Sequence, residues 1–263
     1  MFLELRNTKI HYKLSGKGKK IVLLHGYLED LSVWNDFTYE LEKHFEVLRV
    51  DLLGQGQSGL VSDISTVDLQ AEMLNFVMET LGFEKAVVFG HSMGGYSTLA
   101  FLEKYPEKLS AFCLFHSHPF ADSEMVKANR LREVELINDG KKELLIKQSI
   151  PNMFAEKSKL LYSQEIETTT QKALSVANEG IVAALLGMRL RPDRSNLLSK
   201  TSIPMLYIWG KEDKFVSKET FERINFPQNA EVLVLENSGH CGFWEEKEKT
   251  LAACIHFANK YGI

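Results

Sequence analysis

Short runs of consecutive apolar residues, separated by longer amphipathic stretches, recur along most of the chain. Ile21–Leu24 is apolar throughout, which is typical of a strand buried on both faces of a parallel sheet. Thr66–Leu81 repeats apolar residues at helical spacing, and Gly82 is expected to end that helix. Strands that alternate with helices favour a mostly parallel, doubly wound sheet. The strands are predicted at residues 2–6, 9–14, 21–24, 45–50, 86–89, 111–115, 204–209 and 231–235, with a hairpin turn at Asn7 and Thr8.

Residues 119–200 interrupt this alternation, because their pattern is helical almost throughout. Apolar residues recur every third position over 128–137 before Gly140, and a further helical pattern runs over 171–192. A helical insertion between two strands of a parallel sheet is typical of a lid, and a helical layer packed flat on the sheet is the alternative. The expected organisation is a core and a lid, made of residues 1–118 with 201–263 and of residues 119–200 respectively.

The clearest chemical motif follows the predicted strand at 86–89. Residues 89–95 read Phe-Gly-His-Ser-Met-Gly-Gly and open a helix, which is the context that a Gly-x-Ser-x-Gly nucleophile elbow requires. Gly90 and Gly94 remove side chains that would clash in so sharp a turn. The turn is expected to expose the hydroxyl of Ser92 at the carboxyl edge of the sheet, so that Ser92 is the candidate nucleophile.

A serine hydroxyl needs a base, and the elbow motif predicts the chain order Ser, then Asp or Glu, then His. His240 lies in a loop after the last predicted strand, whereas His256 lies on an apolar helical stretch. Asp213 follows the strand at 204–209 and is the candidate acid that orients the histidine, with its neighbour Glu212 as the alternative. The predicted catalytic triad is therefore Ser92, Asp213 and His240.

The oxyanion formed by such a triad needs two backbone N–H donors. One is expected from Met93, the residue after the nucleophile. The second is expected from Tyr27, in the loop after the strand at 21–24.

Taken together, these motifs resemble the α/β-hydrolase superfamily over nearly the whole chain. His25-Gly26 matches its oxyanion-loop motif, and Ser238-Gly239-His240 matches its histidine loop. Residues 51–58 resemble its Asp-x-x-Gly-x-Gly-x-Ser loop, with Gln55 in place of the more usual histidine. Residues 187–193 are similar to small esterases and enol-lactone hydrolases. The resemblance implies an eight-stranded sheet whose second strand is antiparallel and whose lid follows the sixth strand.

Several side chains are candidates for contact with the substrate, although each has a plainer interpretation. A His-x-His pair can bind metal, but no third ligand is evident, so no metal is predicted. The same pair is also consistent with ordinary hydrogen bonding at the lid hinge, and tryptophan or apolar lid residues are equally consistent with core packing. The candidate contacts are Trp34, His116, His118, Met153, Phe154 and Leu186.

A serine nucleophile attacks a carbonyl carbon, so acyl transfer to water is the expected reaction. Epoxide hydrolases and haloalkane dehalogenases need a carboxylate nucleophile instead, since serine would leave an ether. Hydrolysis of a carboxylic ester or lactone is the first expectation. Cleavage of a carbon–carbon bond beside a ketone, thioester hydrolysis, amide hydrolysis and perhydrolase chemistry use the same triad. A non-catalytic ligand-binding protein of this fold is the alternative of a different class.

Composition narrows the setting further. There are 31 basic and 35 acidic residues, for a net charge of −4, and no dense basic stretch that would indicate a nucleic-acid partner. No signal peptide, membrane span, Gly-x-Gly-x-x-Gly motif or metal cluster is found, so neither a membrane nor a cofactor is expected. The three scattered cysteines fit a reduced, cytoplasmic location. The expected partner is a small ester-like molecule.

Overall fold

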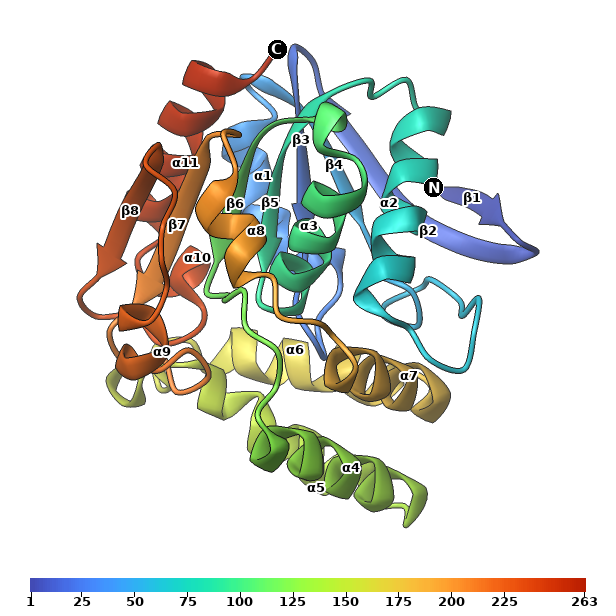
Figure 1. The fold of residues 1–263 in the computed structure, drawn as a ribbon. Helices are drawn as coiled ribbons and strands as arrows, with labels where there is room; N and C mark the ends of the chain where they lie inside the picture. The colour runs from blue at the N-terminus through green and yellow to red at the C-terminus, as the bar shows by residue number, and fades with distance from the viewer.

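The continuous apolar runs form the strands of one central sheet. The computed structural model describes residues 1–263, and Figure 1 shows the sheet between two layers of helices. The strand order is β1-β2-β4-β3-β5-β6-β7-β8, with β2 antiparallel to β1 and β4 and all other neighbours parallel. The prediction of an eight-stranded, mostly parallel sheet is confirmed. The strands are β1 (Phe2–Leu5), β2 (Thr8–Gly16), β3 (Lys19–Leu24), β4 (Phe45–Val50), β5 (Ala86–His91), β6 (Leu109–Phe115), β7 (Met205–Gly210) and β8 (Ala230–Leu235).

The turn between β1 and β2 lies one residue earlier than predicted. Arg6 and Asn7 form it, with φ of 50° and 62°, and Thr8 already pairs with Leu5. Two successive left-handed residues match the twist of a tight hairpin, and asparagine tolerates that conformation better than the β-branched Thr8.

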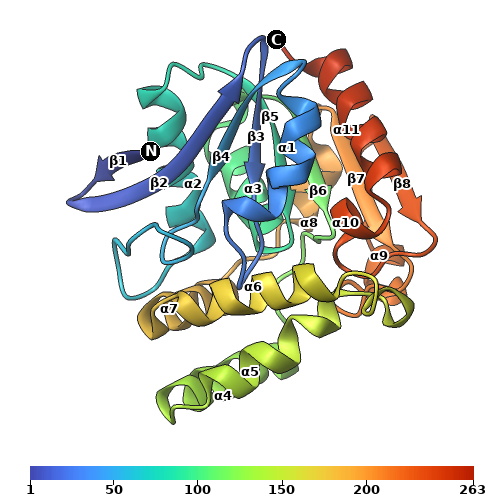
Figure 2. The same ribbon diagram turned by 180° about the vertical axis from the view of Figure 1, so that it is seen from behind.

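Helices cover both faces of the sheet. One face carries α2, α3 and α8, whereas α1, α10 and α11 lie on the other, as Figures 1 and 2 show from opposite sides. Thr66 caps α2 by accepting the Leu69 N–H, and Gly82 follows its end with φ +71°, as expected. None of the helices combines the length and apolar character that crossing a bilayer requires. The helices are α1 (Asn35–Leu41), α2 (Val67–Thr80), α3 (Met93–Lys104), α8 (Ser195–Lys200), α9 (Lys218–Glu222), α10 (Gly242–Glu245) and α11 (Lys247–Tyr261).

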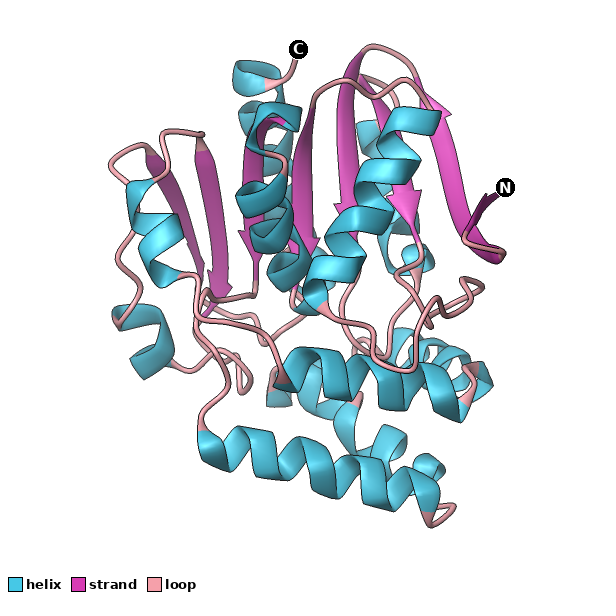
Figure 3. Cartoon of the chain, turned by 45° about the vertical axis from the view of Figure 1, so that its right-hand side comes forward, coloured by secondary structure: helices cyan, strands magenta, loops and turns pink.

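The chain between β6 and β7 forms a separate helical layer at the carboxyl ends of the parallel strands. Figure 3 shows helices and loops there, and no strand. The pattern over 171–192 predicted one helix, but Val176 and Ala177 are extended and divide it into α6 and α7. α5 was not predicted. The helices of this layer are α4 (Glu124–Asn138), α5 (Lys142–Ser149), α6 (Ser163–Ser175) and α7 (Asn178–Arg189), and the short 3-10 helices of the chain are Leu31–Trp34, Pro106–Lys108, Pro151–Met153 and Glu156–Ser158.

The helical layer is packed tightly onto the core through α7. A Cβ at Gly180 would lie 2.0 Å from the Gly54 carbonyl oxygen, and one at Gly187 would lie 1.8 Å from that of Ser65. The two glycines therefore let backbone approach backbone. Gln55, which replaces the more usual histidine, donates its side-chain amide to the Gly180 carbonyl at 3.2 Å. One apolar cluster of 65 buried residues spans both the sheet and this layer. The layer is thus packed against the core as well as lying over the sheet edge.

Candidate active site

Ser92 lies in a sharp turn between β5 and α3. Its backbone has φ 49° and ψ −113°, a conformation that a non-glycine residue holds only when its surroundings fix it. The Ser92 N–H donates to the Phe115 carbonyl at 2.9 Å. A Cβ at Gly90 would lie 2.4 Å from the Gly94 carbonyl oxygen, and one at Gly94 would lie 2.7 Å from that of Leu24. The turn therefore requires the glycines on either side of Ser92, as the elbow motif predicts.

Asp213 and His240 meet beside this turn. Asp213 follows β7 and His240 follows β8, and His240 Nδ1 lies 2.8 Å from Asp213 Oδ2. The other oxygen, Oδ1, accepts the backbone N–H groups of Phe215 at 2.8 Å and Val216 at 2.9 Å. Burial opposes ionisation of Asp213, but the charge of His240 and the donated hydrogen bonds outweigh it and hold the pKa of Asp213 well below its usual range. Asp213 is therefore a carboxylate at every physiological pH.

His116 is a second histidine on the same carboxylate. Its Nδ1 lies 3.0 Å from Asp213 Oδ2, and its Nε2 accepts the Gly242 N–H at 3.1 Å, so Nδ1 carries the proton. Burial lowers the pKa of His116 to about 4, and the ring stays neutral. His116 is fully buried behind Asp213 and does not line the cavity, so the predicted substrate contact is corrected to a hydrogen bond with Asp213.

The ligating atoms of His116, Asp213 and His240 lie within 4.8 Å of one another, a spacing that a metal ion also requires. Both imidazole Nδ1 atoms point at the same oxygen, however, and His116 Nε2 faces an N–H donor. Hydrogen bonds account for all of these contacts: two to Asp213 and one from the Gly242 N–H to His116 Nε2. The cluster is therefore organised as a hydrogen-bonded set.

Glu245 joins the histidine loop to the helical layer. Its carboxylate accepts hydrogen bonds from both, and the His240 N–H itself donates to the Met153 carbonyl at 2.6 Å. The position of His240 therefore depends on the helical layer. The donors to Glu245 are the N–H groups of Ala155, Gly239 and Cys241 and the hydroxyls of Ser158 and Ser238.

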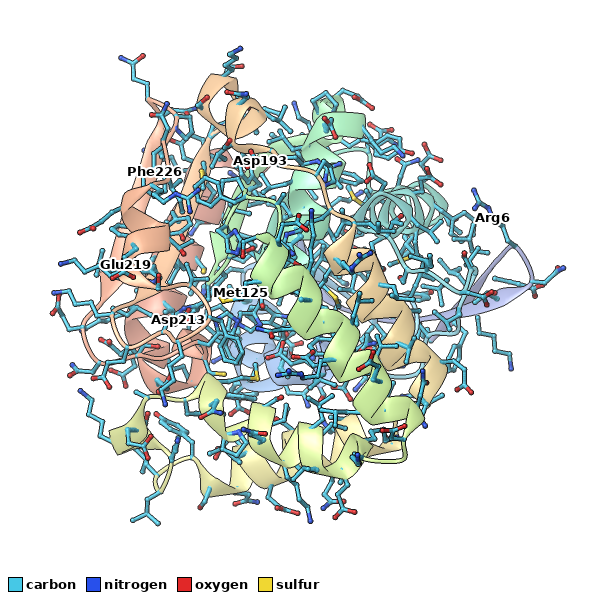
Figure 4. All side chains as sticks on the ribbon, turned by 60° about the horizontal axis from the view of Figure 1, so that its bottom comes forward. Arg6, Met125, Asp193, Asp213, Glu219 and Phe226 are labelled. Carbon is cyan, nitrogen blue, oxygen red and sulfur yellow. The ribbon has the colours of Figure 1, made fainter.

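A cavity of about 500 Å³ lies between the sheet edge and the helical layer. Ser92 and His240 form part of its wall, with Tyr27, His118 and Met153 among the other lining residues. Figure 4 looks onto this side of the molecule, where α4, which carries Met125, crosses in front of the core. The structure thus brings the predicted nucleophile and base into one cavity, together with two of the predicted substrate contacts.

The remaining predicted contacts lie elsewhere. Trp34 is fully buried and packs against Phe115 and Phe243, with ring centroids 5.8 and 4.9 Å away. Phe154 stacks on Trp244 at 5.6 Å. Leu186 does not line the cavity either. Trp34 and Phe154 pack within the protein, and Leu186 is half-buried outside the cavity, so the predictions of substrate contact for these three residues are corrected.

Of the two predicted oxyanion donors, Met93 directly follows Ser92 and Tyr27 lines the same cavity. Met93 is the first residue of α3, a position whose N–H has no partner within the helix. The Tyr27 N–H donates no hydrogen bond within the protein. The alternative acid and the alternative base do not line the cavity. Glu212 pairs with Lys157 at 2.8 Å, and His256 is exposed on α11.

The strand order, the serine turn after β5 and the position of the cavity define an α/β hydrolase. Residues 19–247 match the α/β-hydrolase fold family, and the chain belongs to that family.

Three known proteins are similar to this chain over most of its length. The chain is 31% identical over 254 residues to a 2-hydroxy-6-oxononadienedioate/2-hydroxy-6-oxononatrienedioate hydrolase from Paraburkholderia phymatum, covering 92% of this chain and 88% of that protein. A thermophilic esterase from Thermogutta terrifontis, solved with malate bound, is 30% identical with a TM-score of 0.92, covering 97% and 95% of the two chains. The enol-lactonase from Burkholderia xenovorans LB400 has a TM-score of 0.91 at 20% identity, covering 98% and 100%, and shares the fold.

Three charged residues of the site were missed from the sequence. Glu29 lies three residues after Gly26, His91 directly precedes Ser92, and Glu245 lies five residues after His240. Each is a titratable residue within five positions of a recognised motif, which is the signal that was available.

His118 provides a test of the cavity's electrostatics. Its Nδ1 accepts the Phe120 N–H at 3.3 Å, and burial together with Arg191 lowers its pKa to about 3. The unfolded chain takes up a proton at His118 below about pH 6.5, but the folded chain does not until far lower pH. The free energy of unfolding should therefore decrease as the pH is lowered from 7 to 4. His118→Gln should reduce that pH dependence by up to ~1.4 kcal/mol per pH unit.

Urea unfolding between pH 4 and pH 7 measures the slope. His44→Gln, an exposed histidine, is the matched control and should keep the wild-type slope. Equal slopes for His118→Gln and wild type would contradict a His118 that stays neutral in the folded protein.

Proposed function

We propose that the protein is a serine hydrolase that cleaves a small carboxylic ester or lactone through an acyl-enzyme, with Ser92, His240 and Asp213 as its triad. The observation that carries the proposal is the convergence of the strained Ser92 turn and the Asp213–His240 pair on one cavity. A strained turn, a carboxylate-paired histidine and a cavity together have the geometry of nucleophilic catalysis.

In the proposed reaction, His240 donates its Nδ1 proton to the bond with Asp213, which leaves Nε2 free to act as the base. The Ser92 proton passes to Nε2 while Oγ bonds to the substrate carbonyl carbon. The N–H groups of Met93 and Tyr27 hold the resulting oxyanion. The leaving oxygen then takes the proton from His240, and water repeats the cycle to release the acid.

The charge of the cavity favours a substrate that carries a carboxylate. Four cationic side chains line it against two carboxyl groups, so four minus two leaves an excess of two positive charges. Asp122 lies 2.6 Å from Arg191 and also pairs with Arg130, and burial raises the pKa of Glu133, which weakens its negative charge. The cations are Arg130, Arg191, Lys214 and Arg223, and the carboxyl groups are those of Asp122 and Glu133.

The Tyr27 side chain adds a neutral donor. Its hydroxyl is buried without a hydrogen-bond partner, and burial raises its pKa well above the usual value, so it keeps its proton. An unpaired buried hydroxyl in a cavity wall favours a substrate with an oxygen acceptor. The malate bound to the Thermogutta esterase and the dioate named for the Paraburkholderia hydrolase are both dicarboxylates, which supports an acidic substrate here.

A carbon–carbon bond hydrolase is the second candidate, favoured by the substrate named for the Paraburkholderia relative, a dioate with a 6-oxo group. The same addition of Ser92 to that ketone would break a C–C bond instead of a C–O bond. The electron pair of that bond would stay on the leaving carbon, delocalised as an enolate onto the 2-oxo tautomer of the substrate's 2-hydroxy group, and the leaving carbon would then take the proton from His240. Steady-state turnover of a carboxylated vinylogous diketone, set against a carboxylated ester, distinguishes the two candidates.

The triad is tested by substitution. Ser92→Ala and His240→Ala should each lower kcat by about 10⁴–10⁶, because triad members act as a unit. Asp213→Asn should also be severe, whereas Glu212→Gln should be mild because Glu212 pairs with Lys157 at the surface. The measurements are hydrolysis of nitrophenyl esters and labelling by a fluorophosphonate. Activity of Ser92→Ala within about tenfold of wild type would rule out Ser92 as the nucleophile.

Substrate charge is tested with esters of matched length. A nitrophenyl ester with a terminal carboxylate should have a higher kcat/KM than its neutral counterpart by about tenfold to a hundredfold, because hydrogen bonds to charged groups contribute ~1.5–3 kcal/mol. Arg130→Met should remove most of that preference. Arg132→Met, an exposed arginine on the same helix, should keep it. Equal preference in all three proteins would refute recognition of the carboxylate by Arg130.

Chain-length preference tests the cavity wall. Met153→Ala should shift the preferred acyl length, because one methylene in an apolar pocket is worth ~1–3 kcal/mol, or about tenfold to two-hundredfold in kcat/KM. Leu186→Ala is the matched control and should give a curve parallel to wild type, since Leu186 does not line the cavity. A shift in Leu186→Ala and none in Met153→Ala would place the acyl group elsewhere.

A further inference from the structure

His91 and Glu29 form a fully buried pair that no step of the proposed reaction uses. His91 Nδ1 lies 2.9 Å from Glu29 Oε2, and neither side chain has any solvent exposure. His91 directly precedes Ser92, and its ring lies 4.9 Å from that of His240. Two ionisable side chains buried this deeply are expensive to desolvate unless each is closely paired.

The hydrogen bonds of the pair connect three catalytic segments. His91 Nε2 lies 2.8 Å from the His240 carbonyl oxygen, and because a carbonyl only accepts, Nε2 must carry a proton. Glu29 Oε2 accepts the Gly26 N–H at 2.6 Å as well as facing His91 Nδ1. One continuous set of bonds therefore runs from the oxyanion loop through Glu29 and the elbow to the histidine loop.

The residues around the pair leave room for it and enclose it. A Cβ at Gly26 would lie 2.9 Å from both Glu29 Oε2 and His91 Nδ1, so only glycine allows the carboxylate to lie against this backbone. The rings of Trp34 and Phe243 meet the His91 ring edge-on, at 6.3 and 5.0 Å. The apolar walls exclude water, which strengthens the interaction between the two charges.

The surroundings of the pair favour its ionised form. Burial opposes both charges, but their mutual attraction and hydrogen bonds dominate, so the pKa of Glu29 is lowered and that of His91 is raised. A charged His91 has N–H groups on both nitrogens, so it can bond to Glu29 and to the His240 carbonyl at once. The other titratable groups near the pair are His25, His116, Asp213, His240 and Cys241.

We propose that Glu29 and His91 are positioning residues, which hold the oxyanion loop, the Ser92 turn and the His240 loop in register for catalysis. The inference rests on the proposed triad and adds two residues that touch neither substrate nor the reacting atoms. Loss of the charge on Glu29 leaves His91 neutral, with a single N–H. One of its two bonds must then weaken, and the loops lose their mutual alignment.

Glu29→Gln and His91→Gln test this with little change in volume. Each should lower kcat by about tenfold to a hundredfold, because small misplacement of catalytic groups is costly, while KM stays within about threefold. The double variant should be no slower than the slower single variant, since both residues belong to one bonded set. Steady-state kinetics on a nitrophenyl ester, with the Tm of each variant, provides the measurement.

His11→Gln is the matched control. His11 and Asp51 form a comparable buried pair, 2.7 Å apart, that lies outside the cavity. This substitution should lower Tm but leave kcat within about twofold of wild type, because the His11 ring bonds only to Asp51, and Asp51 keeps its bond to the Leu31 N–H. If Glu29→Gln does not fold, His91→Gln with His11→Gln decides the same question.

The outcomes separate this inference from the proposed function. If Ser92→Ala stays active, the triad is wrong and the positioning role falls with it. If Ser92→Ala is inactive but folded Glu29→Gln and His91→Gln keep kcat within about twofold of wild type, only the positioning role is refuted. An equal loss of kcat in His11→Gln would also refute it, since the effect would then be general destabilisation.

Discussion

Carboxylates removed from water govern how this site is built. A buried carboxylate must collect hydrogen bonds or a counter-charge, and each one here collects them from different parts of the chain. Asp213 holds two histidines and its own loop, Glu29 joins the oxyanion loop to the elbow, and the half-buried Glu245 joins the histidine loop to the helical layer. The hydrogen bonds that stabilise each carboxylate therefore also hold segments of the site together. Substitution of one carboxylate is expected to disturb more than one segment.

The parallel sheet makes this convergence possible. Carboxyl ends of parallel strands lie at one edge, so residues that follow β3, β5, β7 and β8 meet although Gly26 and His240 are more than two hundred positions apart in the sequence. The helical layer between β6 and β7 covers that edge and supplies the far wall of the cavity. The strand order thus determines which side chains lie close together, and hydrogen bonds to buried carboxylates fix their positions.

Local signals predicted the strands and the chemistry better than they predicted the cavity. The strand runs and the glycines around Ser92 follow from rules that depend on neighbours in the chain, so these features were found from the sequence. Whether Trp34 faces substrate or core depends on the rings of Phe115 and Phe243, which are distant in sequence. The same holds for His116, whose partner Asp213 lies 97 residues away. Residues whose role is set by long-range packing could be proposed but not assigned.

His240, the proposed base, is linked to the helical layer by hydrogen bonds. His240 donates its N–H to Met153, and Met153 also lines the cavity. Glu245 ties the next residues of that segment, at Ala155 and Ser158, to the histidine loop. A displacement of this segment would therefore move the wall of the cavity and the position of the base together. The helical layer between β6 and β7 is thus coupled to the position of His240 through hydrogen bonds, and not only to the shape of the cavity.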